Sequence, residues 1–198
     1  MSTFKLTLSL SLIVLSLSSC EAQIPNKEQQ IASAVMAAPE EKRADATVMG
    51  YNDKNELVII KLGTNELICL ADDPQKEGYN SSCYHKDLEP FMARGRELQA
   101  EGKSREEIFD IRAKEAEEGK LILPKNPATL HVLSGANGYY DAEKGEVVNA
   151  NLRYVVYIPY ATQESTGLPI RPLVPGGPWI MDPGTHRAHI MVTPPVDN

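Results

Sequence analysis

The chain has 198 residues, of which 42% are hydrophobic and 24% charged. This length and composition allow one domain with a buried core and exclude collagen-like and wholly disordered chains. The 27 acidic and 20 basic residues give a net charge of -7, which argues against the positive surface that nucleic-acid binding needs, so we expect no nucleic-acid partner.

The first twenty residues resemble the export signal of a bacterial lipoprotein. Lys5 precedes an apolar run over residues 6–17, which is too short to cross a bilayer as a helix. Residues 17–20, Leu-Ser-Ser-Cys, are similar to a lipobox, and the resemblance implies cleavage after residue 19 and a lipid on Cys20. The alternative is an ordinary secretory signal that happens to end near a cysteine.

A lipid on Cys20 makes the membrane an expected partner, because two acyl chains anchor a protein stably. Glu21 is not the aspartate that, by resemblance to enterobacterial lipoproteins, retains such proteins at the inner membrane. We therefore expect an outer-membrane lipoprotein that faces the periplasm or the exterior. Residues 20–45 are expected to form a flexible tether, with at most a short helix over 27–36, and residues 46–198 a single domain.

Alternating apolar and polar residues predict strands over 47–51, 56–62 and 66–71, separated by turn-forming residues. This spacing is typical of a β-meander. Val58, Ile59 and Ile60 are apolar in succession, which predicts a middle strand that is covered on both faces.

Helical periodicity follows over residues 88–101. A second helix begins after Ser104, which forms an S-x-x-E capping box with Glu107, and it ends at Gly119. Its charged residues, which include Arg112, are interpreted as a solvated outer face.

The last third of the chain returns to strand patterns. Strands are predicted over 129–134, 139–140, 147–160 and 188–192. Between the last two lies a long loop, residues 159–183, that is rich in proline and glycine. Together these elements predict an α+β fold with a mainly antiparallel sheet, an inserted helical hairpin and this loop before the last strand.

The two remaining cysteines, Cys69 and Cys83, favour a disulfide in an exported protein. Two alternatives stay open. Both could be buried free thiols, or Cys83 could act as a nucleophile with His85, although no oxyanion donors are identifiable in the sequence.

Four polar residues could form a metal site: His85, Asp182, His186 and His189. The last two histidines are three residues apart in what is predicted to be a strand, where their side chains would point to opposite faces. The spacing is a weak metal signal, so we predict no metal and no cofactor.

The long loop carries candidate ligand-binding residues, because stiff segments with aromatic and small polar groups suit recognition. We single out Tyr160, Arg171, Trp179 and, from the following strand, His189. The alternative for Trp179 is a place in the core. No catalytic residue can be assigned, and the sequence favours a binding protein over an enzyme.

Three runs of the chain are similar to a family of uncharacterised exported bacterial proteins: residues 69–74 (CLADDP), 83–94 (CYHKDLEPFMAR) and 158–162 (IPYAT). The resemblance covers about residues 44–192 and implies export but no activity. The sequence thus supports a lipid-anchored envelope protein with a binding or structural role, toward a protein or a small molecule. The rival hypothesis is a periplasmic metal-dependent or other hydrolase that uses the three histidines and Asp182.

Overall fold

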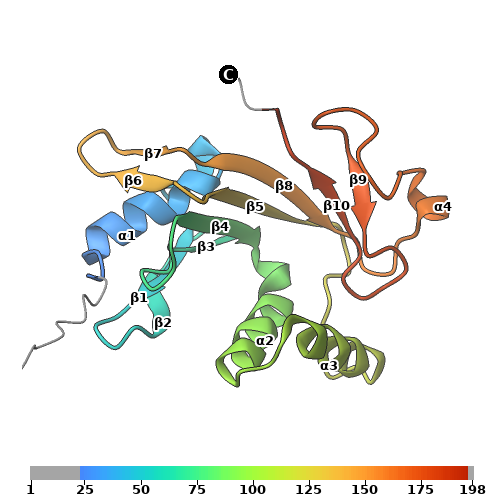
Figure 1. The fold of residues 1–198 in the computed structure, drawn as a ribbon. Helices are drawn as coiled ribbons and strands as arrows, with labels where there is room; N and C mark the ends of the chain where they lie inside the picture. The colour runs from blue at the N-terminus through green and yellow to red at the C-terminus, as the bar shows by residue number, and fades with distance from the viewer. Residues whose placement is uncertain (1–22, 196–198) are drawn as a thin grey trace, which may run out of the picture.

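The computed structural model describes residues 23–195 (Figure 1). The expected signal segment and Cys20 lie outside these residues. The described part combines α-helices with an eight-stranded, mostly antiparallel sheet and a separate two-stranded hairpin, which confirms the predicted α+β class. Within this part, none of the helices has both the length and the apolar content that a bilayer crossing requires.

The elements follow one another from the helix nearest the N-terminus to the strand nearest the C-terminus. Their bounds are α1 (Lys27–Ala34), η1 (Val35–Ala37), η2 (Glu40–Lys42), β1 (Thr47–Tyr51), β2 (Leu57–Lys61), β3 (Leu67–Leu70), β4 (Tyr79–His85), η3 (Lys86–Leu88), α2 (Glu89–Ala100), α3 (Arg105–Glu117), β5 (Ala128–Gly135), β6 (Tyr139–Asp141), β7 (Glu146–Val148), β8 (Asn151–Tyr157), α4 (Gln163–Thr166), β9 (Trp179–Met181) and β10 (His189–Val192). The large sheet has the order β2–β1–β3–β4–β5–β8–β10–β9.

The first three strands do not form the predicted meander. β1 lies between β2 and β3, and it runs antiparallel to β2 but parallel to β3. The link from β2 to β3 therefore crosses over, and Gly63 permits it because a Cβ there would lie 2.2 Å from the carbonyl oxygen of Asp45. β2 becomes an edge strand, so the expectation that it is covered on both faces is wrong: Ile59 is 56% exposed.

β4 is a strand that the sequence pattern did not reveal. Buried residues alternate along the strand, at Tyr79, Ser81 and Cys83. The middle residues, Asn80, Ser81 and Ser82, are all polar, so this alternation is not visible as a hydrophobic pattern. β4 pairs antiparallel with β3 and with β5, and the helical hairpin follows it directly. Successive strand residues point to opposite faces, so Cys83 and Tyr84 enter two different cores.

Helix α1 covers one face of the sheet over β1 and β4. Its buried Gln30 exchanges two hydrogen bonds with the backbone of Tyr51: the amide nitrogen donates to the Tyr51 carbonyl at 2.9 Å, and the Tyr51 N–H donates to Oε1 at 2.6 Å. Ala34, Ala37 and Ala38 pack into the core beneath it. The expectation of a tether over residues 20–45 is therefore wrong from Lys27 onward, because this segment forms part of the core.

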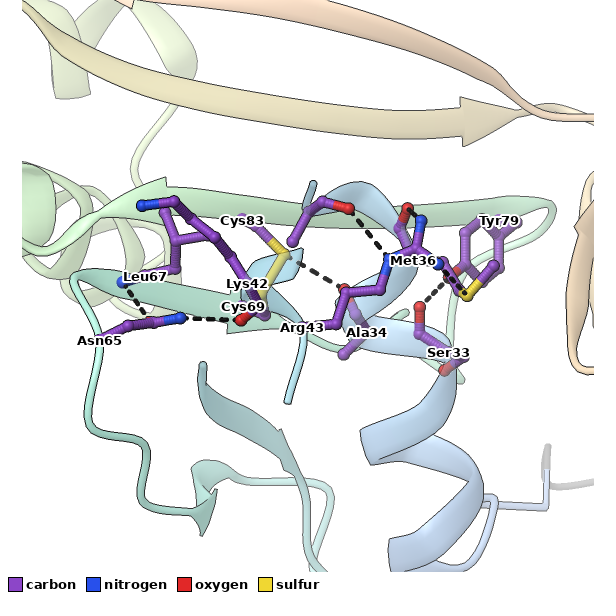
Figure 2. Close-up of a disulfide and its surroundings, with 11 residues drawn as sticks. Ser33, Ala34, Met36, Lys42, Arg43, Asn65, Leu67, Cys69, Tyr79 and Cys83 are labelled. Carbon is purple, nitrogen blue, oxygen red and sulfur yellow. Dashed lines mark hydrogen bonds between the residues drawn. A yellow bond between two sulfur atoms is a disulfide. The ribbon is translucent and has the colours of Figure 1, made fainter. Parts of the chain in front are cut away.

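A disulfide joins Cys69 of β3 to Cys83 of β4 in this same core (Figure 2). The two residues face each other across the antiparallel pair, with their Cα atoms 4.0 Å apart, and both are fully buried. The Cys83 sulfur lies 3.4 Å from the carbonyl oxygen of Ala34. The cross-link and the end of α1 thus pack directly on one another.

The other face of the sheet is covered by α2, which packs with Tyr84 and Leu88 against β5, β8 and β10. Figure 1 shows α2 and α3 as a helical hairpin, and its face of the sheet is the one opposite α1 because the two pack on the separate cores of Tyr84 and Cys83. The predicted capping box is confirmed: Ser104 Oγ accepts from the Glu107 N–H at 3.2 Å, and the Ser104 N–H donates to Glu107 Oε2 at 2.8 Å.

The proline-rich segment contains two short elements, α4 and β9. β9 pairs with β10 and places Trp179 opposite Met191. Ile180 is fully buried, and its N–H donates to the Pro169 carbonyl at 2.9 Å, so the preceding loop folds back over the strand. The exposed apolar side chains of this loop are Ile170, Leu173 and Val174.

Candidate functional site

A buried arginine lies where α3 meets α2. Arg112 is only 8% exposed, and its guanidinium carbon is 3.9 Å from the centre of the Phe91 ring. Its Nη1 donates to the Phe91 carbonyl at 3.2 Å. Gly95 leaves room for it, because a Cβ on that residue would lie 3.0 Å from Nη1. The ring and the helix backbone together fix the position of the guanidinium group.

Arg112 has no carboxylate partner among the described residues. Glu115, one turn further along α3, is bound by Arg94 through contacts of 2.8–3.1 Å. Arg112 Nε is buried without a hydrogen-bond partner. Burial lowers the pKa of Arg112 to about 10, so the side chain is still cationic at neutral pH. An unpaired buried charge is destabilising, which makes this position unusual.

A buried histidine lies next to this arginine. The ring of His186 packs between Phe91 and Phe109, with centroid distances of 5.9 and 4.7 Å, and its Nε2 lacks a partner. Burial, and then the charges of Arg112 and Arg187, lower the pKa of His186 to about 4. His186 is therefore neutral at neutral pH and adds a second unsatisfied polar atom to the cluster.

A cavity of about 420 Å³ opens beside Arg112, between the helical hairpin and the end of β8. We call it the arginine cavity. Four of the eight arginines in the chain line it, together with apolar and aromatic side chains. Its lining residues are Phe91, Met92, Gly95, Arg96, Gln99, Arg105, Ile108, Arg112, Tyr157 and Arg187. Such a concentration of positive charge is unusual in an acidic protein.

Two of these arginines are neutralised by acidic residues. Arg96 contacts Glu89 at 2.7 Å and donates to the Tyr84 hydroxyl at 3.0 Å. Arg187 contacts Asp182 at 2.7 Å. Within the described part of the chain, Arg112 and the exposed Arg105 form no such ion pair. The cavity thus has two uncompensated positive charges.

The loop that carries His186 is held in a strained conformation. Tyr160 and Asp182 both adopt positive φ values, 65° and 51°. This region is unfavourable for a bulky residue such as tyrosine. The Tyr160 N–H donates to the Thr185 carbonyl at 2.7 Å, which ties the two segments together. Strain of this kind persists where the surrounding structure enforces it, and it is concentrated at functional sites.

The structure separates the four ligand-binding residues that the sequence suggested. Tyr160 lines a smaller cavity of about 180 Å³ together with His186. His189 stacks on Tyr157 at 5.1 Å, and its Nδ1 donates to the Arg187 carbonyl at 2.7 Å. Trp179 packs against the core that contains Tyr84 and Leu88, and Arg171 is exposed on the loop. None of the four therefore lines the arginine cavity, although His189 contacts Tyr157, which does.

The four residues suggested for a metal site do not assemble. Asp182 is engaged by Arg187, and the ring of His186 lies between two phenylalanine rings. His85 accepts a hydrogen bond from the Asp87 N–H at 3.2 Å at the start of the helical hairpin. In the part of the chain that the structure describes, no three His, Cys, Asp or Glu side chains come close enough together to hold a metal ion.

The central residue of the site, Arg112, was missed by the sequence interpretation, which placed it on a solvated face. A signal was present: Arg112 lies four residues after Ile108 and so shares its face of the helix. Chemically, a fixed guanidinium that lines a cavity and has no carboxylate partner among the described residues can bind an anion. A comparison with models of known protein families finds no match, and neither do searches of curated proteins and of solved structures.

Proposed function

We propose that this protein is exported, anchored to the cell envelope by a lipid on Cys20, and binds a small anionic ligand in the arginine cavity. The observation that carries the binding role is Arg112, a buried cation with no carboxylate partner among the described residues and an unpaired Nε. A purely structural arginine would have its charge balanced by the fold. A ligand anion supplies this balance instead.

The anchoring part of the proposal comes from the sequence, since residues 17–20 resemble a lipobox. It is tested by metabolic labelling with a fatty-acid analogue. Labelled wild-type protein and unlabelled Cys20→Ser protein support the anchor. Equal absence of label from both removes it without affecting the anion site.

The binding role is tested by isothermal titration calorimetry of the full chain with sodium salts of small carboxylic acids, at constant ionic strength. We expect saturable binding that Arg112→Met weakens by at least about tenfold, because hydrogen bonds to a charged group contribute about 1.5–3 kcal/mol. Lys114→Met is the matched control. It removes one positive charge from an exposed position of the same helix and leaves binding unchanged.

Two outcomes contradict the binding role. One is that no carboxylate gives saturable binding to the wild-type protein. The other is that Arg112→Met binds as well as Lys114→Met does. Circular dichroism of both variants establishes that each is folded before the affinities are compared.

A further inference from the structure

The face of α3 that lines the arginine cavity has a charge at each end and an apolar residue between. Arg105, Ile108 and Arg112 all line the cavity. Positions i, i+3 and i+7 of a helix lie on one face. The two arginines are two turns apart, so their Cα atoms are separated by about 10 Å along the helix.

The inner and outer arginines differ in burial but share the absence of an acidic partner in the described part of the chain. Arg112 is buried at the inner end, and Arg105 is exposed at the first residue of α3. Arg96 and Arg187, which complete the set, are already bound to Glu89 and Asp182. A ligand that complements both of these arginines carries two negative groups, one for each end of this face of α3.

The wall between these ends is largely apolar. Met92, Ile108, Phe91 and Tyr157 all line the cavity. The two rings are in contact with each other, with their centroids 5.5 Å apart. Apolar surface of this kind favours the uncharged body of a ligand over hydrated inorganic ions.

The inner end further selects the type of anion. Nη1 of Arg112 is occupied by the Phe91 carbonyl, and Nε is buried without a partner. Nη2, which has no hydrogen-bond partner among the described residues, is the nitrogen left to donate a charge-assisted hydrogen bond to a carboxylate in the cavity.

We infer that the ligand is an elongated dicarboxylate, an apolar body with a carboxylate at each end. The inner carboxylate binds Arg112, the outer one binds Arg105, and the body lies along Met92 and Ile108. This inference rests on the proposed anion-binding function and names the ligand class for the same cavity.

The test compares aliphatic dicarboxylates of increasing chain length, from succinate to sebacate, with monocarboxylates of equal length. Isothermal titration calorimetry of the full chain gives the affinities. We expect the dicarboxylate of best-matching length to bind about fivefold more tightly than its monocarboxylate, which is the upper range for an exposed ion pair. Arg105→Gln removes this advantage and leaves the monocarboxylate affinity unchanged. Lys114→Gln, with the same charge change, retains the advantage.

The inference is overturned if dicarboxylates and monocarboxylates of equal length bind equally at every length, or if Arg105→Gln keeps the difference. In both cases, monocarboxylate binding that depends on Arg112 still supports the proposed function. If neither class of ligand binds, the proposed function itself fails. Arg105 is exposed, so its substitution is not expected to disturb folding.

Discussion

The two faces of the sheet are covered by helical segments that differ in how their polar groups are satisfied. On the α1 face, Gln30 bonds to the backbone of Tyr51 on both sides of its amide, and a disulfide crosses the core. On the α2 face, Arg112 and His186 each have a buried nitrogen with no partner. The Ser81 hydroxyl is also unpaired on the α1 face, but it is uncharged. The polar side chains named on the first face are mostly paired within the fold, whereas those on the second are not, as the proposed anion site requires.

The largest expected effect tests whether the disulfide on the α1 face stabilises the fold. Replacing Cys69 and Cys83 together by alanine removes a cross-link that spans 14 positions. Chain entropy predicts a loss of about 3 kcal/mol of unfolding free energy for a loop of this size. Urea denaturation measures the loss, and carboxylate binding should be unchanged at low urea. A loss below about 1 kcal/mol would contradict a stabilising role for the cross-link.

The second-largest expected effect is a pH dependence of the unfolding free energy, which arises from His186 on the α2 face. The pKa of His186 is lowered to about 4 by burial and by Arg112 and Arg187, whereas in the unfolded chain it is 6.5. The unfolded chain therefore binds more protons between these values, so stability falls as the pH falls through this window. We expect a loss of about 2 kcal/mol between pH 7 and pH 5.

His186→Phe serves as the comparison for this pH dependence, because a ring at this position still packs between Phe91 and Phe109. Urea denaturation of the two proteins at several pH values should show a shallower slope for the variant. Some slope should remain, since burial also lowers the pKa values of His131 and His189. Equal slopes in the two proteins would mean that His186 is not the group responsible.

The smallest expected effect is the most informative about Arg112. Replacement of an unpaired buried charge by an apolar residue is often neutral or stabilising, so Arg112→Met should remain within about 1 kcal/mol of the wild-type unfolding free energy. Urea denaturation, with Lys114→Met as the control, measures the difference. A loss of about 3 kcal/mol or more would show that Arg112 stabilises the fold, as the α1-face groups do.

Local signals in the sequence predicted most of the local elements, although they missed β4. Alternation located β1, and the Ser104–Glu107 capping box located the start of α3. What could not be read from such signals depends on partners far away in the chain. The position of β1 between β2 and β3 is one example, and the burial of α1, whose apolar residues are few, is another.

The candidate site was harder to predict for a related reason. Arginine on a helix is usually exposed, and only the packing of α2 against α3, together with Phe91 and Gly95, buries Arg112. His186 was singled out as a metal ligand, yet its neighbours are two phenylalanine rings. The sequence identified a residue of the site without its chemistry, because that chemistry is set by contacts between distant segments.

The packing of α1 onto the sheet also bears on how an anchored molecule would be oriented. If Cys20 carries the lipid, Lys27 follows it by seven positions, and even a fully extended chain of that length spans only about 25 Å. The face of the sheet that α1 covers would then lie close to the bilayer surface. The α2–α3 hairpin packs on the opposite face of the sheet, so the arginine cavity would lie on the side away from the bilayer, where dissolved ligands arrive by diffusion.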